Sequence, residues 1–311
     1  MRPATALALA VLLCGSAVAA QPLAPRRRPV PRHRVPPPPP TPPVVEASTA
    51  DGTVTLKTPA AEAILIRSGT FTMGSDEAEI AHALTLCQHE QDHDDCVQEM
   101  FAYEYRPRPV FISDVWIDRT EVTVARYRQC VAAGRCREPP YAAGGERFNR
   151  PDLPVVLVTW SDASGFCTWA GGRLPTEAEW ERAARGLAGR RYPWGNVYNP
   201  NLSNHGRLAY DELDPDDGFI ELAPVGSYPD GRTPDGIADL AGNVEEWVGD
   251  WYQEYPVMSE WNPRGPDSGD ERVIRGGSHH HARPWLRGAS RGHDLPSARR
   301  PYRGFRCARP A

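Results

Sequence analysis

Three consecutive histidines, His279-His280-His281, are the residues of this sequence best suited to hold a transition metal. Imidazole nitrogens ligate iron, copper and zinc, and a carboxylate such as Glu245 could complete such a site. Neighbouring side chains in an extended segment point to opposite faces, so His279 and His281 are the two that could readily share one ion. The alternative is a partly exposed histidine run without metal. The pattern leaves both interpretations open.

Three arginines, Arg283, Arg287 and Arg291, follow the histidines at intervals of four residues. Guanidinium groups recognise carboxylates through paired hydrogen bonds, so this segment could bind an acidic ligand. The same arginines could equally be surface groups or partners in internal ion pairs. The spacing alone does not choose between these roles.

Several other function classes find no support in the sequence. It contains no phosphate-binding glycine loop, nucleophile elbow or HExxH helix. The polar stretch 89–95 holds histidines and aspartates that could bind a cation, but we interpret it as a solvated insertion between Cys87 and Cys96. The net charge of −5 argues against a surface for polyanions, so no nucleic-acid partner is expected.

The N-terminal fifty residues indicate export. Residues 1–20 combine Arg2, an apolar run and a small-residue cleavage site, which is the pattern of a signal peptide. Lipid anchoring through Cys14 is the less favoured alternative, because Leu13 precedes it. Residues 21–50 are rich in proline and arginine, which predicts a disordered, extended linker. We therefore expect a periplasmic or extracellular protein, and no later stretch is apolar enough to span a membrane.

Residues 51–311 correspond to one large domain, in which six cysteines suggest disulfides. Six cysteines allow fifteen pairings. Cys130 and Cys136 flank a turn at Gly134, and the other close pair brackets a polar stretch, so both look like local links. The six are Cys87, Cys96, Cys130, Cys136, Cys167 and Cys307.

The first half of this domain shows readable secondary structure. Helices are expected from Thr123 to Ala133, from about Ser161 to Ala170, and after a capping box formed by Thr176 and Glu179. Short strands are expected at 63–66, 69–74, 110–112 and 115–117. From Tyr192 onward Pro, Gly, Asn and Asp dominate, and single aromatics argue for an ordered but irregular chain.

Taken in order, the sequence motifs resemble the formylglycine-generating enzyme (sulfatase-modifying factor) domain over about residues 60–309. The resemblance implies an α+β fold with little regular secondary structure, related to C-type lectins. It also matches Cys167 and Cys307 to a structural disulfide of the family. The remaining four cysteines would then form the two local pairs, Cys87–Cys96 and Cys130–Cys136. The motifs are Gly69–Ser75, Glu121–Thr123, Pro154-Val155, Val158–Trp160, Arg173–Glu181, Tyr192–Asn196, Asp235-Gly236, Gly242–Val244, Glu246-Trp247, Arg275–Ser278 and Gly304–Arg306.

The resemblance also implies two structural calcium sites. Carboxylates and backbone carbonyls are the ligands that calcium prefers. The alternative is that these acids are solvated loop residues. The first set is Asp239, Gly242, Val244 and Glu246, and the second is Asn204, His205, Asp217 and Phe219, with His205 and Phe219 contributing carbonyls.

The catalytic part departs from the family. Its enzymes carry a copper-binding cysteine pair three and eight residues after the serine that corresponds to Ser278, and here these positions hold His281 and Leu286. Leu286 cannot do thiolate chemistry. The residue between Val244 and Glu246, usually tryptophan, is Glu245. Formylglycine generation by the family mechanism is therefore not expected.

Two functions remain. The favoured one is a calcium-stabilised binding or scaffold module whose groove, near Ser278, His281, Leu286 and Glu245, holds a protein, peptide or glycan. The alternative is a divergent metal-dependent oxidoreductase with His279 and His281 as ligands. Fold-level inheritance does not decide between them.

Overall fold

A computed structural model describes residues 44–46, 55–58, 61–91, 96–141, 147–207 and 213–311. The expected signal peptide, Cys14 and most of the expected linker lie outside the described residues, as do 92–95 of the polar stretch. Strand β1 (Val44–Glu46) lies inside the stretch for which the sequence predicts a disordered linker. It pairs with β2 (Thr55–Thr58), which lies just after that stretch. Extended pairing therefore begins earlier than the composition of 21–50 indicates.

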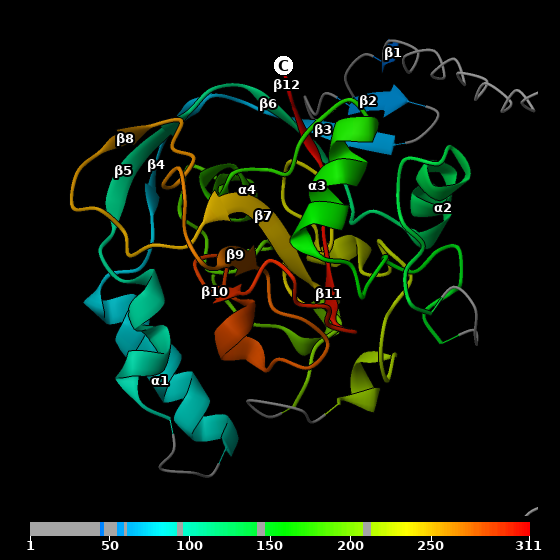
Figure 1. Cartoon of the computed structure of the whole chain (residues 1–311). Helices are drawn as coiled ribbons and strands as arrows, with labels where there is room; N and C mark the ends of the chain where they lie inside the picture. The colour runs from blue at the N-terminus through cyan, green and yellow to red at the C-terminus, as the bar shows by residue number, and fades with distance from the viewer. Residues whose placement is uncertain (1–43, 47–54, 59–60, 92–95, 142–146, 208–212) are drawn as a thin grey trace, which may run out of the picture. The chain divides into compact units, whose positions relative to one another are not determined.

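Among the described residues the strands form three small sheets (Figure 1). One has the order β1-β2-β3-β6-β12, the second β10-β9-β7-β11, and the third β4-β5-β8. The strands not yet placed are β3 (Ala61–Ile66), β4 (Gly69–Met73), β5 (Arg108–Ile112), β6 (Val115–Asp118), β7 (Glu245–Trp251), β8 (Glu260–Trp261), β9 (Arg272–Arg275), β10 (Arg291–Asp294), β11 (Arg303–Gly304) and β12 (Ala308–Pro310).

Helices α2 and α4 begin where their capping residues predict, and α3 begins one residue before the expected Ser161. Helix α2 (Val124–Ala132) is capped by Thr123, α3 (Trp160–Trp169) by Thr159, and α4 (Glu177–Arg185) by Thr176. In the last two, the N-cap hydroxyl accepts a hydrogen bond from the third helical residue, whose carboxylate accepts one from the N-cap amide. The three expected helices are confirmed.

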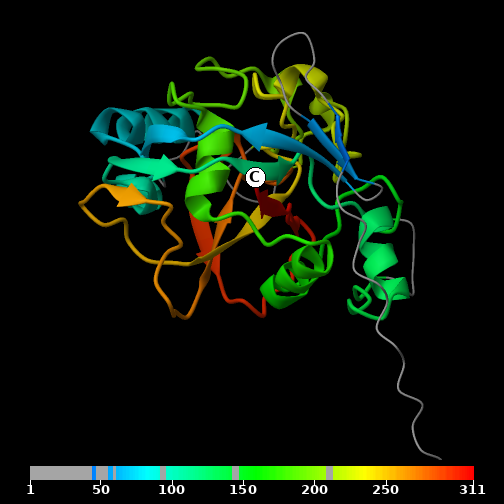
Figure 2. The ribbon, with the colours of Figure 1, turned by 90° about the horizontal axis from the view of Figure 1, so that it is seen from above.

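Helix α4 is the central element of the core. It contacts β4 and β5 as well as β7 and β9, so it lies between the three-stranded and four-stranded sheets (Figure 2). Trp180 is fully buried, and the charged residues Glu177 and Glu181 are buried beside it. A helix with acidic side chains on a buried face needs buried cations, and arginines of the later strands supply them.

Helix α1 (Glu77–Gln91) and the 3-10 helix η1 (Gln98–Glu104) were not expected from the sequence. Ile80, Ala83 and Cys87 of α1 pack with Phe101 of η1, and the Cys87–Cys96 disulfide joins the two elements. His89 lies in α1, so the start of the polar stretch 89–95 is helical and not a loop. This helical pair packs on the 3-10 helix η5 (Arg283–Leu286).

All three expected disulfides are confirmed. Besides Cys87–Cys96, the structure contains Cys130–Cys136 and the long-range pair Cys167–Cys307. The second half is irregular, as expected: between α4 and β7 the described chain has only the short 3-10 helices η2 (Pro200–Leu202), η3 (Pro215–Asp217) and η4 (Pro229–Gly231). In the described part of the chain, no helix has both the length and the apolar character needed to cross a bilayer.

Candidate functional site

Two glycines shape the segment that leads from β9 into the histidine run. Gly276 and Gly277 have φ angles of +96° and +66°, which side chains rarely adopt. A Cβ on Gly276 would lie 3.1 Å from the Trp180 ring, and one on Gly277 would lie 2.9 Å from both Leu286 Cδ2 and the carbonyl oxygen of Trp285. The segment therefore passes close to α4 and η5, and Ser278 becomes fully buried.

The histidine run forms a turn and is not extended. The amide of His281 donates to the carbonyl of Ser278 (2.9 Å). The ring Nδ1 of His281 lies 2.8 Å from Ser278 Oγ and accepts a hydrogen bond from the Ser278 amide (3.1 Å). An Nδ1 that accepts from an amide carries no proton, so in this arrangement Nε2 is the protonated nitrogen of a neutral His281.

The other two histidines have different contacts. His279 is buried, and its Nδ1–H donates to the carbonyl of Asn243 (2.8 Å). Burial lowers the pKa of His279 to about 4, so the ring is neutral at physiological pH. His280 lies between the rings of His279 and Tyr302, with centroid distances of 4.5 and 5.0 Å. No group of three or more His, Cys, Asp or Glu side chains is arranged to hold a metal among the residues that the structure describes.

Leu286 is fully buried, in an apolar cluster with Tyr192 and Ala241. The neighbouring Trp285 packs on Phe101 of η1, with ring centroids 5.6 Å apart. The side chain at position 286 is therefore part of the core and cannot reach a ligand.

Arg287 and Arg291 form internal ion pairs. Arg287 makes a bidentate pair with Glu104 of η1, and Arg291 makes one with Glu177 of α4 (2.7 Å for each hydrogen bond). Burial alone raises the pKa of Glu177, but Arg291 and Arg275 hold it below its usual value. Arg283 lies 5.7 Å from the Tyr198 ring centroid. The ion-pair interpretation therefore holds for Arg287 and Arg291, and Arg291 also lines the cavity described next.

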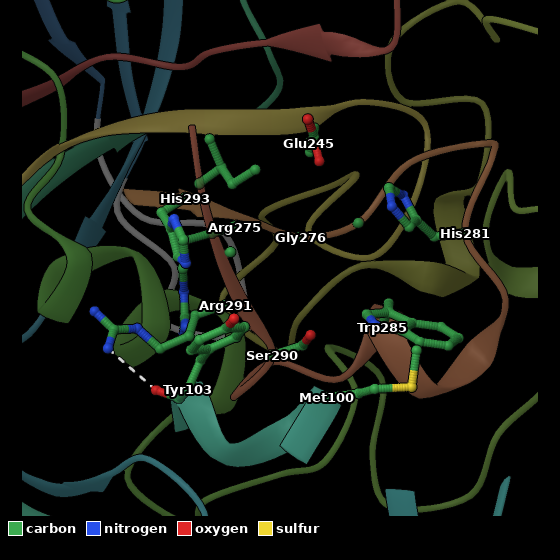
Figure 3. Close-up of a pocket in the computed structure, with 13 residues that line it drawn as sticks. Met100, Tyr103, Glu245, Arg275, Gly276, His281, Trp285, Ser290, Arg291 and His293 are labelled. Atoms are coloured by element: carbon green, nitrogen blue, oxygen red, sulfur yellow. Dashed lines mark hydrogen bonds between the residues drawn. The ribbon is translucent and has the colours of Figure 1, made fainter. Parts of the chain in front are cut away.

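A cavity of about 320 Å³ lies beside these residues (Figure 3). Glu245 of β7 lies on one side of it and His281 and Trp285 on another, whereas η1 contributes Met100 and Tyr103. The remaining lining residues are Ile274, Arg275, Gly276, Gly277, Ser290, Arg291, Gly292 and His293.

The structure thus brings together part of the candidate site predicted from the sequence. His281 and Glu245 face the same cavity, and Ser278 lies against His281 without lining it. Glu245 is held by Arg303, whose Nε and Nη2 lie 2.5 Å from its Oε1. Sequence reasoning missed Met100 and Tyr103, because they belong to the unexpected helical pair. The spacing of Ile80, Ala83, Leu84 and Cys87 on one helical face could have revealed α1.

Three members of the first expected calcium set, Asp239, Gly242 and Val244, lie between η4 and β7, and the fourth, Glu246, lies in β7. Asp239, Gly242 and Asn243 all have positive φ angles, of +57°, +90° and +60°. Asp239 Oδ2 accepts from the amide of Gly226 (2.6 Å). Glu246 of the same set is fully buried and is paired with Arg306.

A further acid, Glu121, accompanies this set, although the sequence placed it in a family motif and not among the expected calcium ligands. It is fully buried, and its Oε2 has no hydrogen-bond partner among the described residues. Burial raises the pKa of Glu121 well above its usual value, and the charge of Asp239 raises it further. Burial likewise raises the pKa of Asp239. Burial opposes the ionisation of both acids, so a cation bound between them would be stabilised.

The second expected set is connected to the first through Asn243. Asn204 Nδ2 donates to Asn243 Oδ1 (3.0 Å), and Asn243 Nδ2 donates to Glu121 Oε1 (2.9 Å). Asn204 Oδ1 is buried without a hydrogen-bond partner in the described part of the chain. Asp217 accepts from the amides of His205 (2.7 Å) and Phe219 (3.0 Å), and burial raises its pKa.

Comparison with known proteins identifies the family to which this sequence is similar. Residues 50–311 match the family described as the sulfatase-modifying factor enzyme 1-like domain. Formylglycine-generating enzyme of Bos taurus is 31% identical over 282 residues, which cover 80% of this chain and 75% of that protein. A Mus musculus protein named inactive C-alpha-formylglycine-generating enzyme 2 is 39% identical over 183 residues, which cover 55% of this chain and 54% of that protein.

The fold is also shared with a solved structure. PvdO from Pseudomonas aeruginosa superposes with a TM-score of 0.61 at 24% identity, over 86% of this chain and 97% of the other. This likeness confirms the expected α+β fold of the formylglycine-generating-enzyme type. The extent of the family match and the identity with the Bos taurus enzyme together lead to one conclusion: the chain belongs to the sulfatase-modifying factor enzyme 1-like domain family.

Proposed function

We propose that this protein is a non-catalytic member of its family, and that the cavity beside His281 holds a peptide segment of a partner protein. The proposal rests on His281 and Leu286, which occupy the two positions that hold the copper-binding cysteines in the enzymes of the family. Leu286 is buried in an apolar cluster, and Nδ1 of His281 is occupied by Ser278. These residues do not fit a copper–thiolate centre, and the six cysteines of the described chain are all in disulfides.

Similarity supports this interpretation. One relative of this chain, from Mus musculus, carries the word inactive in its name. A domain described as sulfatase-modifying has a protein as its target, so a peptide is the ligand class that this inheritance favours over a glycan.

The composition of the cavity suits a peptide. Tyr103 is 44% exposed at its rim, and Trp285 lies in the wall. Aromatic side chains provide large contact area at low entropic cost and are common among residues that dominate binding. The Nε2–H of His281 and the carboxylate of Glu245 could meet backbone carbonyl and amide groups of an extended peptide.

A transition-metal oxidoreductase is the weaker candidate. Nδ1 of His279 is bound to the Asn243 carbonyl, and Nδ1 of His281 is bound to Ser278. Metal analysis by mass spectrometry on protein with His279, His280 and His281 all changed to alanine separates the two functions. Loss of about one equivalent of iron, copper or zinc relative to wild type would favour the oxidoreductase; an unchanged metal content supports the binding role.

We also propose structural calcium at both expected sets. The unpartnered oxygens of Glu121 and Asn204 are the observation that favours it, because buried carbonyl and carboxylate oxygens are ligands that calcium prefers. Glu121 and Asp239 would hold the first ion with the carbonyls of Gly242 and Val244. Calcium would supply no redox chemistry and would tie the irregular second half together.

We propose that the protein is exported to the periplasm or the extracellular space. Three disulfides are typical of an oxidising compartment, and the sequence of residues 1–20 agrees with a secretory route.

Selection from a random peptide library tests the binding proposal. Sequences enriched on wild-type protein should bind Tyr103→Ala at least ~10-fold more weakly, a loss of about 1.4 kcal/mol. Tyr105→Ala is the matched control, because Tyr105 is 41% exposed and follows the same 3-10 helix but does not line the cavity. Failure to enrich any sequence, or equal binding to both variants, would refute a peptide role for this cavity.

A further inference from the structure

A second cavity, of about 530 Å³, lies where three segments that are distant in the sequence meet. The first turns of α3 form one wall of this cavity, and the residues that follow α2 form another. Residues 296–299, between β10 and β11, form the third wall. The cavity shares no lining residue with the one beside His281.

The lining of this cavity carries more positive than negative charge. Its charged residues are three arginines and one aspartate, Asp162. Asp162 Oδ2 lies 2.8 Å from Arg299 and also accepts from the amide and the hydroxyl of Thr159 (3.1 and 2.7 Å), so this acid is already neutralised. Arg135 and Arg137 form no ion pair with an acid in the part of the chain that the structure describes. Two positive charges therefore remain uncompensated, in a protein whose net charge is −5.

The polar groups of the lining are within reach of a ligand from solvent. Arg135, Arg137, Ser161 and Ser297 are all exposed. Guanidinium groups bind phosphate and similar oxyanions through paired hydrogen bonds, and serine hydroxyls can donate to further oxygens. Donors on three walls suit a tetrahedral group with three terminal oxygens better than they suit a planar carboxylate.

Contacts outside the cavity hold its walls in place. The amides of Arg135 and Cys136 both donate to the carbonyl of Cys130 (3.0 and 3.3 Å), and the Cys130–Cys136 disulfide closes the same turn. The amide of Trp160 donates to the carbonyl of Pro296 (3.1 Å), which joins the start of α3 to the third wall. The space is therefore preformed, as in most small-molecule sites.

Gly165 provides an independent observation. It lies inside α3 and lines the cavity, and a Cβ added to it would meet no heavy atom within 4 Å. Neither packing nor a positive φ angle requires glycine at this position. Glycine is less favourable than alanine inside a helix, and a close approach of a ligand to the helix backbone is one reason to have it there.

We propose that this cavity binds a small organic molecule that carries a phosphate or sulfate group. Arg135 and Arg137 hold the anionic group, the hydroxyls of Ser161 and Ser297 donate to it, and the organic part lies over Gly165. The volume of about 530 Å³ exceeds what a free anion needs and lies within the range of roughly 300–1,000 Å³ that is usual for small-molecule sites.

Fluorine NMR with matched probes tests the proposal. The probes are 4-fluorophenyl phosphate, 4-fluorophenyl sulfate, 4-fluorobenzoate and the neutral 4-fluoroanisole, which share one ring. Wild-type protein should bind at least one of the two esters ~10-fold or more tightly than 4-fluoroanisole, because only an anion can accept charge-assisted hydrogen bonds from the arginines. The ester that binds more tightly identifies the preferred group, and 4-fluorobenzoate should bind more weakly than that ester.

Variants of the lining separate charge from shape. Arg135→Ser and Arg137→Ser should each weaken binding of the ester at least ~5-fold. Arg264→Ser is the matched control, because Arg264 is also exposed but does not line the cavity, and it should bind like wild type. Gly165→Glu brings a carboxylate into the cavity and should weaken the ester more than Gly165→Gln, which has the same size without the charge.

Thermal melting without probe guards against loss of the fold. Both Gly165 variants should melt at or above the wild-type temperature, because a glycine inside a helix is replaced by a better helix former. The proposal is overturned if wild type binds neither ester, or if it binds 4-fluoroanisole or 4-fluorobenzoate as tightly as the better ester. Unchanged ester binding by the double variant Arg135→Ser/Arg137→Ser would overturn it as well.

Discussion

Arg287 and Glu104 are joined by two hydrogen bonds in the protein interior, of 2.8 and 2.5 Å, although 183 residues separate them in the chain. Their side chains are 1% and 2% exposed. The pair connects η1 to the residue directly after η5, so it fixes the helical pair α1–η1 against the segment that carries Trp285 and Leu286. The rim of the cavity beside His281 depends on this connection.

Removal of one partner should therefore destabilise the domain strongly. We expect Arg287→Met to lower the free energy of unfolding by about 3–5 kcal/mol, because it leaves a buried carboxylate without a cation. Urea unfolding at pH 7 measures the change. Arg67→Ala is the control: Arg67 is 67% exposed and pairs with Asp114, and its loss should cost less than about 1 kcal/mol.

The double variant Glu104→Gln/Arg287→Met provides the contrasting case. With both charges removed, part of the lost stability should return. If the single and double variants are equally destabilised, uncompensated charge is not the cause of the effect.

Calcium should stabilise the folded protein. In the presence of free calcium at 100 times its dissociation constant, the gain is expected to be about 2.7 kcal/mol per site. Differential scanning calorimetry with calcium or with chelator measures it. Glu121→Gln should reduce the gain, since it removes charge from the first set, whereas Glu138→Gln, an exposed acid in a different region, should leave it unchanged. A melting temperature that does not respond to calcium would contradict the structural role.

The three disulfides should differ in their contribution to stability. The loop closed by Cys167–Cys307 spans 140 residues, and its removal by a double alanine substitution should cost about 5 kcal/mol on the chain-entropy model. The loop closed by Cys130–Cys136 spans six residues, for which the same model gives about 2 kcal/mol. Denaturant unfolding of the two double variants compares them. Equal losses would show that chain entropy is not the main contribution.

Asp250 should make stability fall as the pH rises. Burial raises its pKa to about 8, and the neighbouring Glu177 adds to the shift. Between the unfolded pKa, near 4, and the folded value, the native state retains a proton that the unfolded chain releases. This group alone should therefore reduce the free energy of unfolding by about 2–3 kcal/mol from pH 5 to pH 7.

Asp250→Asn tests this dependence, because the asparagine carbonyl can still accept from the amide of Glu177, as Asp250 does at 2.8 Å. The measurement is the difference between the pH profiles of the two proteins. If the profiles are parallel, Asp250 does not titrate in this range.

Local signals in the sequence predicted some elements well. Thr123 and Thr176 mark the starts of α2 and α4, because a capping hydroxyl satisfies amides of the first turn whatever the tertiary context. Cys167 and Cys307 were matched through the family resemblance and are paired. The irregular second half was expected from its composition.

The strands of the four-stranded sheet were not predictable in the same way. Arg272 and Arg275 begin and end β9, and both are buried. Arg275 fits the interior because Glu181 lies 2.6 Å away and the carbonyls of Gly288 and Ala289 accept its remaining hydrogen bonds. Hydrophobic periodicity cannot identify a core position held by arginine, because the partner that compensates its charge is distant in sequence.

The pairing of residues 303–310 has a consequence for how the domain forms. Strand β12 lies on β6, β11 lies on β7, and the amide of Val122 donates to the carbonyl of Phe305. The first half therefore cannot reach its native state until these late residues have been synthesised. Folding must follow translation of the whole domain. Until then, the nascent chain exposes the unpaired edge of β6 and the thiol of Cys167, whose partner is Cys307. Such high contact order predicts slow folding and a need for chaperones during biosynthesis.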